Sequence, residues 1–188
     1  ILASSSEDGL ISIHDPSQPN EEDALVSVLN VGTPTRSIGF FGPNMEGIYA
    51  LTGNESLSVY AWDAAQKISD VGVGGGMQLR DTLSGIVDNN MNGNGRSSDA
   101  MSDGGNTIEY LVGCTWSDIS TTTSSRSTAS SPALHLLAGN SNGDGYIFRI
   151  DVNEITPITH LKGGHRGCIR DFCWVEEGER LITGGEDA

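Results

Sequence analysis

The sequence predicts an all-β protein made of repeated antiparallel sheets of about four strands each. Two observations carry this prediction. Short apolar segments alternate with polar residues at a period of two, which is typical of strands with one buried face, and one strand–turn–strand pattern recurs along the chain. Helical periodicity is nearly absent. The chain has 188 residues, of which 36% are hydrophobic, so it holds enough apolar material for a core.

The recurring unit is a hairpin that ends in aspartate. Residues 2–15 (LASSSEDGLISIHD) align without gaps with residues 50–63 (ALTGNESLSVYAWD). Residues 136–151 (LLAGNSNGDGYIFRID) follow the same pattern when two extra turn residues are allowed, and residues 181–188 repeat its first half. Each copy therefore predicts two strands joined by a short turn.

Turn chemistry supports the hairpins, and further strands flank them. Asp8-Gly9 and Asp144-Gly145 supply turn residues that tolerate a positive φ. Apolar segments before and after each hairpin bring the total to roughly four strands per repeat. We expect these additional strands at residues 24–31, 36–41, 67–73, 108–116, 156–162 and 168–175.

Two segments interrupt this pattern. Residues 88–106 are dominated by Asn, Gly, Ser and Asp, and residues 117–131 are dominated by Ser and Thr. Neither segment has enough apolar surface to offset the entropy lost on ordering, so we expect both to be disordered loop insertions between strands. Without them, the spacing of the repeats approaches the 40–45 residues or so of a four-stranded repeat.

A polar pattern in the last repeat points to a family. His165 follows a glycine and lies 18 residues before Thr183, and Asp187 lies four residues after Thr183. A buried carboxylate in a tight turn needs donors, which an imidazole and a hydroxyl supply. With Trp62-Asp63 at the end of the second hairpin, these residues resemble the WD-repeat (WD40) family of β-propellers. The resemblance implies blades pinned by His, Ser or Thr, Asp and Trp.

On that resemblance, we expect residues 1–188 to form a single fragment of about three to four blades, an incomplete ring from a larger propeller. The first repeat departs from the family pattern at His14, which stands where Trp is expected, and the second departs at Ser56, which replaces Asp. The residues predicted to form the structural network of the blades are His165, Thr183, Asp187, Ser4, Asp8, Thr52 and Trp62.

Composition limits the partners. The formal charge of −15 and the pI near 4.3 argue against binding to nucleic acid or to an anionic membrane, and basic segments of other proteins are the better electrostatic match. No apolar run approaches the roughly 20 residues that span a bilayer.

The cysteines, Cys114, Cys168 and Cys173, are odd in number and lack the spacing of a disulfide framework. Reduced thiols in the cytoplasm or nucleus are therefore expected.

The predicted function is a non-catalytic scaffold for protein–protein interactions, with no cofactor and no metal. The alternative is a recognition module for basic or modified peptides. Two remote alternatives fall within residues 139–151. Ser141 lies in a G-x-S-x-G pattern of hydrolases, but a strand follows where a helix is required. Residues 140–151 resemble a calcium loop, but it lacks the first Asp and the last Glu. No motif assigns partner-binding residues.

Overall fold

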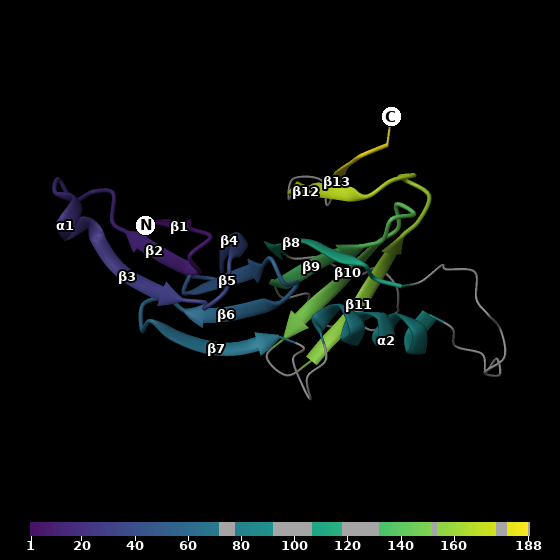
Figure 1. The fold of residues 1–188 in the computed structure, drawn as a ribbon, viewed down its shortest axis with the longest axis horizontal. Coiled ribbons are helices and arrows are strands. Elements are labelled where there is room, and N and C mark those ends of the chain that lie inside the picture. Colours follow the sequence, from purple (N-terminus) through teal and green to yellow (C-terminus); the bar gives the residue numbers. More distant parts are fainter. Residues whose placement is uncertain (72–77, 92–106, 118–131, 152–153, 176–179, 188) are drawn as a thin grey trace. The chain divides into compact units, whose positions relative to one another are not determined.

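The computed structural model describes residues 1–71, 78–91, 107–117, 132–151, 154–175 and 180–187 (Figure 1). The chain divides into two compact units, residues 1–73 and 74–188, and each is described by itself. The strands of these described residues assemble into four antiparallel sheets. The predicted all-β class, with sheets of up to four strands, is confirmed.

The first unit contains two sheets, with strand orders β1-β2-β3 and β4-β5-β6-β7. The strands predicted at residues 24–31, 36–41 and 67–73 correspond to β3, β4 and β7, and the two predicted hairpins are present. The elements of this unit are β1 (Leu2–Ser5), β2 (Leu10–His14), α1 (Glu21–Ala24), β3 (Leu25–Asn30), β4 (Thr35–Phe41), β5 (Gly47–Thr52), β6 (Leu57–Ala61) and β7 (Gln66–Val71).

The core of the first unit lies between these two sheets. On β2, Ile11 and Ile13 are fully buried, whereas Ser12 between them is partly exposed, as the period of two predicts. They pack with Leu29 of β3 and with residues of the second sheet that include Ile48. Burial of an aliphatic side chain of this size contributes about 1.5–3 kcal/mol. One face of the β1-β2-β3 sheet therefore packs against the β4-β5-β6-β7 sheet.

The second unit contains a four-stranded sheet with the order β11-β10-β9-β8 and a two-stranded sheet of β12 and β13. Strands predicted at residues 108–116, 156–162 and 168–175 correspond to β8, β11 and β12. The elements of this unit are α2 (Leu79–Met91), β8 (Tyr110–Ser117), β9 (Ala133–Gly139), β10 (Gly145–Asp151), β11 (Glu154–Leu161), β12 (Ile169–Val175) and β13 (Arg180–Gly185).

Helix α2 is a departure from the sequence prediction. Leu79, Leu83 and Val87 are buried on one face of the helix at a spacing of four residues, and the helix packs against β11. The helix also includes residues 88–91, the start of the segment predicted to be a disordered insertion, and Ser117, the start of the other, ends strand β8. The remainders of both segments, residues 92–106 and 118–131, lie outside the described residues.

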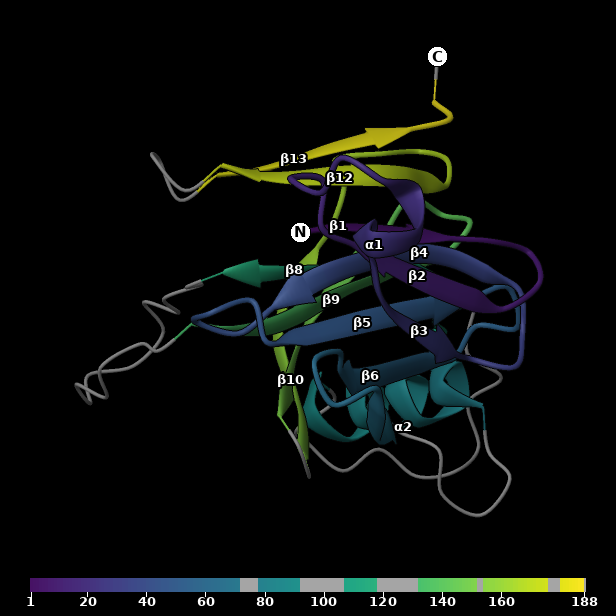
Figure 2. The ribbon, with the colours of Figure 1, turned by 90° about the vertical axis from the view of Figure 1, so that its left-hand side faces the viewer.

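The two sheets of the second unit share a core. Leu137 of β9, Ile147 of β10 and Ile169 of β12 are buried together, and Phe172 of β12 and Leu181 of β13 pack against them. Figures 1 and 2 both place the β12–β13 sheet next to β8. The hydrophobic contact between these sheets fixes the position of the polar residues at their ends.

The turn between β9 and β10 corrects one detail of the prediction. Its positive φ, +84°, belongs to Gly143, whereas Gly145 already belongs to β10 with ordinary strand pairing. A Cβ on Gly143 would lie 2.5 Å from the carbonyl carbon and oxygen of His165. The turn therefore rests on the backbone of the loop that leads into the neighbouring sheet. In the first unit Gly9, with a φ of +81°, has the positive φ that Asp8-Gly9 predicted.

Candidate functional site

A polar cluster of the second unit is centred on the imidazole of His165, in the loop between β11 and β12. Its Nδ1 lies 2.7 Å from Oδ1 of Asp187, and its Nε2 lies 2.8 Å from Oγ1 of Thr183 on β13. An ionised carboxylate can only accept, so Nδ1–H donates to Asp187, and in that tautomer of the neutral imidazole Nε2 can accept the Thr183 hydroxyl proton. The structure thus brings together the three residues that the spacing selected.

The network changes the acidity of its carboxylate. The hydrogen bond from His165 lowers the pKa of Asp187 below its ordinary value of 3.8, because it favours the ionised form. A lowered pKa means that the folded state releases this proton more readily than the unfolded state. The contribution of Asp187 to stability is therefore complete above pH 3.8 and is lost as the pH falls through the lowered pKa.

Replacement of Asp187 by Asn should flatten the acid side of the stability profile. Asn keeps an acceptor for Nδ1–H of His165 but cannot ionise, so the stability that depends on this carboxylate should disappear. Urea unfolding of the intact protein at intervals from pH 6 to pH 2 measures this difference. In the Thr183→Val variant, which retains the His165–Asp187 pair, the acid dependence should remain. An Asp187→Asn profile parallel to that of the unmodified protein below pH 4 contradicts the assignment.

The predicted network residues of the first unit are not joined in the same way. Both Ser4 and Asp8 are exposed, and Asp8 instead accepts a hydrogen bond from the backbone N–H of Leu10 at 2.9 Å, which stabilises the turn. In the second repeat the hydroxyl of Thr52, which is buried, lies 2.6 Å from the hydroxyl of Ser56. Ser56 occupies the position of the missing Asp, so this turn uses a hydroxyl pair.

Trp62 does not join Thr52. Its indole N–H donates to the backbone carbonyl of Met45 at 2.6 Å, and its ring meets Phe40 edge to face with centroids 6.3 Å apart. Since β5 and β6 are antiparallel, Thr52 and Trp62 lie at opposite ends of the hairpin. The structure therefore does not bring Trp62 and Thr52 together. Its observed role is to fasten the turn before β5.

The third repeat carries a different histidine and carboxylate. His160 of β11 stacks on Tyr146 of β10 with centroids 4.4 Å apart, and its Nε2 lies 3.7 Å from Oδ1 of Asp144. Asn140 holds the turn by accepting the backbone N–H of Asp144 at 3.1 Å. Burial raises the pKa of Tyr146, and the nearby Asp144 adds to this effect. The family pattern places histidine in the loop before the first strand of a repeat. His160 lies on strand β11, so that pattern did not select it.

Ser141, the candidate nucleophile, lies in the turn between β9 and β10. Its hydroxyl donates to Oε1 of Glu109 at 3.1 Å, and its backbone N–H donates to Oε2 at 2.9 Å. The following element is strand β10, so the local structure is a hairpin turn and not a strand-to-helix elbow. Within the described part of the chain, no three His, Cys, Asp or Glu side chains gather as a metal site requires.

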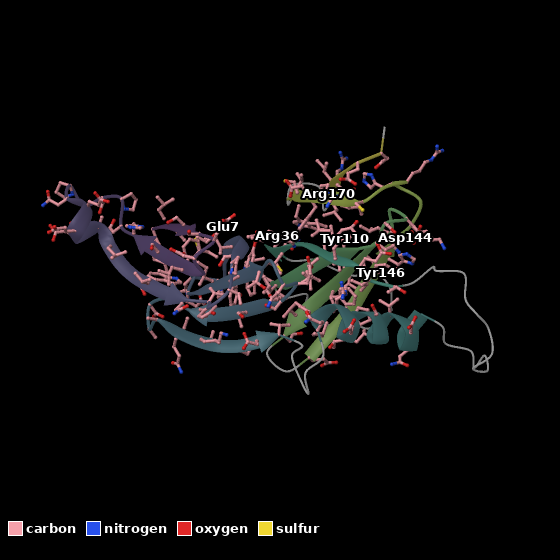
Figure 3. All side chains as sticks on the ribbon, in the orientation of Figure 1. Glu7, Arg36, Tyr110, Asp144, Tyr146 and Arg170 are labelled. Atoms are coloured by element: carbon pink, nitrogen blue, oxygen red, sulfur yellow. The ribbon has the colours of Figure 1, made fainter. Side chains whose placement is uncertain are left out.

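Tyr110 links the two sheets of the second unit. Its hydroxyl, at the start of β8, donates to the backbone carbonyl of Asn140 at 3.1 Å and accepts the backbone N–H of Ile169 at 2.8 Å (Figure 3). Burial raises the pKa of Tyr110 to about 12. The hydroxyl therefore stays protonated at neutral pH and makes both bonds. No motif selects this residue, because its partners are backbone groups of distant segments.

Paired Arg and Glu side chains recur at equivalent positions in the two units. Nη1 of Arg36 lies 3.4 Å from Oε1 of Glu55, and Nε of Arg170 lies 2.8 Å from Oε1 of Glu186. Each glutamate follows the network threonine, Thr52 or Thr183, by three residues. The spacing of three residues between threonine and glutamate was visible in the sequence. The pairing with arginine was not, because the two arginines precede their hairpins by different distances.

Comparison with known proteins finds similarity to WD-repeat proteins. No protein-family model matches the chain. It is 29% identical over 187 residues to WD repeat-containing protein 89 homolog of Dictyostelium discoideum, covering 100% of this chain and 43% of the relative. A stretch of 63 residues, 33% of this chain, is 41% identical to WD repeat-containing protein GTS1 of Arabidopsis thaliana and covers 16% of it. The chain thus spans less than half the length of both relatives.

Repeat pattern, sheets and relatives agree. The hairpins recur in sequence, they form antiparallel sheets of the blade type, and the last repeat joins a loop histidine to a strand threonine and a turn aspartate. The fold is that of a partial WD40 β-propeller. On these grounds, the relatives and the fold support an assignment of the chain to the WD-repeat family.

Proposed function

We propose that the chain is a non-catalytic scaffold that binds other proteins through its exposed loops and strand edges. WD-repeat proteins generally bind other proteins, and both relatives carry that family name. The observation that supports the proposal best is the way the His165 network is closed. A Cβ on Gly185 would lie 2.7 Å from both Nδ1 of His165 and Oδ1 of Asp187. The chain's own backbone fills the space beside the ring.

This closure matters because the network has the order of a hydrolase triad, namely hydroxyl, imidazole and carboxylate. A triad needs a nucleophile that a substrate can approach and room for the bound substrate. Thr183 is instead a partly buried secondary alcohol on a strand, and Gly185 occupies the site beside His165 and Asp187. We infer that the hydrogen bonds hold a loop to a strand and catalyse no reaction, so that no cofactor is required.

Reconstitution tests the scaffold. The intact protein, purified with an affinity tag from its native source, should bring down protein partners at fixed stoichiometry, and at least one should form a complex with it from purified components. A panel of ester and amide substrates should show no turnover. Turnover that is lost in the His165→Ala variant and kept in the His14→Ala variant would instead show an enzyme.

A second candidate, a recognition module for basic or modified peptides, is favoured by one specific observation. Residues 1–35 contain six Asp and Glu and no Lys or Arg.

All three cysteines lie in the described part of the chain and none forms a disulfide, which fits a reducing compartment, so we place the protein in the cytoplasm or nucleus. None of the described helices is long and apolar enough to cross a membrane.

A further inference from the structure

Strand β3 has one open edge. It pairs with β2 along one side, and no described strand pairs with its other side (Figure 1). An unpaired edge presents backbone N–H and C=O groups that another strand can bind, so proteins commonly protect such edges with charge, proline or a covering element. The sequence of β3, LVSVLN, contains no charged residue and no proline.

The equivalent edge strands of the next two sheets show this protection. On β7, Lys67 and Asp70 form an ion pair of 2.7 Å between Nζ and Oδ1. Strand β11 contains Pro157, and helix α2 packs against it. On β3, by contrast, three exposed side chains are apolar. Leu25, Val26 and Val28 are 47%, 49% and 44% exposed, which are high values for residues of this kind.

Acidic side chains border β3 at both ends. Helix α1, with Glu21, Glu22 and Asp23, directly precedes the strand. At the other end, Asn30 pairs with Leu10, which follows the turn that contains Glu7 and Asp8. Residues 1–35 contain no Lys or Arg, and Arg36, which follows them, pairs with Glu55 at 3.4 Å. Surface charges act over about 8 Å at physiological ionic strength.

We propose that the open edge of β3 binds an extended segment of a partner protein, which adds to the sheet as a further strand and carries Lys or Arg at its ends. Backbone hydrogen bonds would supply affinity, and alternate apolar side chains would meet Val26 and Val28. The basic ends would lie near Glu21 and Glu22 and near Glu7 and Asp8. This inference rests on the proposed function as a protein-binding scaffold.

Charge decides against a second copy of this chain as the occupant. In an antiparallel pair of two β3 strands, helix α1 of one copy would approach the Glu7–Asp8 turn of the other. In a parallel pair, the two α1 helices would approach each other. Both arrangements place like charges together, which weakens association. A basic segment from another protein meets no such repulsion.

Fluorescence polarisation with the intact protein tests the site. The probe is a labelled peptide, Lys-Lys-Val-Thr-Val-Thr-Val-Thr-Lys-Lys, whose segment between the lysines matches the six residues of β3. It should bind at low salt, and at 0.5 M NaCl its affinity should fall by about tenfold or more, because exposed charges are screened. Two matched peptides should fail to bind: one with Glu in place of Lys, and one with N-methyl groups on alternate backbone nitrogens.

Protein variants locate the binding edge. The pair Val26→Lys and Val28→Lys, made together, should abolish binding without lowering the melting temperature, because both side chains are exposed. The matched control is Ile68→Lys on β7, where the replaced side chain is 50% exposed, and it should bind normally. Glu21→Lys with Glu22→Lys should weaken binding by about tenfold.

Three results would overturn the proposal. They are equal binding of the N-methylated peptide, unchanged binding by the β3 double variant, and a dimer in sedimentation experiments that the β3 variant dissociates. The test separates this proposal from the scaffold proposal. If native partners still purify with the β3 double variant while the peptide never binds, the scaffold stands and the β3 site fails.

Discussion

Replacement of Gly143 by Ala should lower the free energy of unfolding by about 2–4 kcal/mol. Two costs add at this position. The φ of +84° is strained for any residue with a Cβ, and the new Cβ would lie 2.5 Å from the carbonyl group of His165. That group is backbone, so it cannot move aside as a flexible side chain would. Urea unfolding of the intact protein measures the change.

Two glycines in the next loop separate these costs. Gly163 has a φ of +76°, and a Cβ added there would have no atom within 4 Å, so Gly163→Ala should cost about 1–2 kcal/mol from the backbone alone. Gly164 has neither problem, and Gly164→Ala should leave stability unchanged or slightly raised. If Gly143→Ala cost no more than Gly163→Ala, the contact with His165 would be unimportant.

The same contact recurs in the first unit, where Gly9 has a φ of +81° and its Cβ would lie 2.9 Å from the backbone nitrogen of Thr33. In both units the turn of one hairpin rests on the segment that leads into the next sheet. The two units therefore share a way of joining consecutive sheets, although their side chains at these turns differ. At these turns the two units share their backbone geometry and not their polar networks, because the close contact and the positive φ require glycine.

The strands were predictable because their signal is local. Alternation in β2 and the turn at Asp8-Gly9 specify a hairpin within a few residues, and Thr183 and Asp187 flank a single turn. His165 was found through a family spacing and not through local chemistry. Helix α2 was missed, although Leu79, Leu83 and Val87 have helical spacing, because the Asn- and Gly-rich residues that follow dominate the composition.

The contacts of Trp62, Tyr110 and His160 could not be predicted for a different reason. Trp62 bonds to the carbonyl of Met45 and Tyr110 bonds to Asn140 and Ile169, and in each case at least one partner is a backbone group fixed by the packing of sheets. Backbone groups have no residue signature, so no sequence pattern reveals such bonds. His160 lies near Asp144 in the third repeat for a related reason: the pairing of β11 with β10 brings His160 beside the turn residue that precedes β10.

Tyr110→Phe should lower the free energy of unfolding by about 2–3 kcal/mol, because it leaves the N–H of Ile169 and the carbonyl of Asn140 without the hydroxyl that joins them. The replacement keeps the ring and its packing. Gly139 lies close to the hydroxyl, since a Cβ there would be 2.8 Å from it, which restricts entry of a substitute water on that side. The hydrophobic contact between the sheets is unchanged, so the fall in the free energy of unfolding measures the two hydrogen bonds.

Alkaline unfolding gives a second measure of the same hydroxyl. Its folded pKa of about 12 exceeds the ordinary value of 10.0, so the folded state holds this proton more tightly than the unfolded state. The contribution of Tyr110 is therefore complete below pH 10 and is lost as the pH rises towards 12. The phenylalanine variant should lack this part of the alkaline loss. If its profile between pH 10 and 12 matches that of the unmodified protein, Tyr110 does not carry the link.

Thr35→Val is the matched control for removal of a hydroxyl. Oγ1 of Thr35 is buried and has no hydrogen-bond partner among the described residues. Loss of a partnerless hydroxyl removes a desolvation cost and no bond, so stability should change by less than about 0.5 kcal/mol or should rise. A hydroxyl is thus expected to matter only where it joins two segments. The hydroxyl of Tyr110 joins β8 to the turn after β9 and to the start of β12, and so links the two sheets of the second unit.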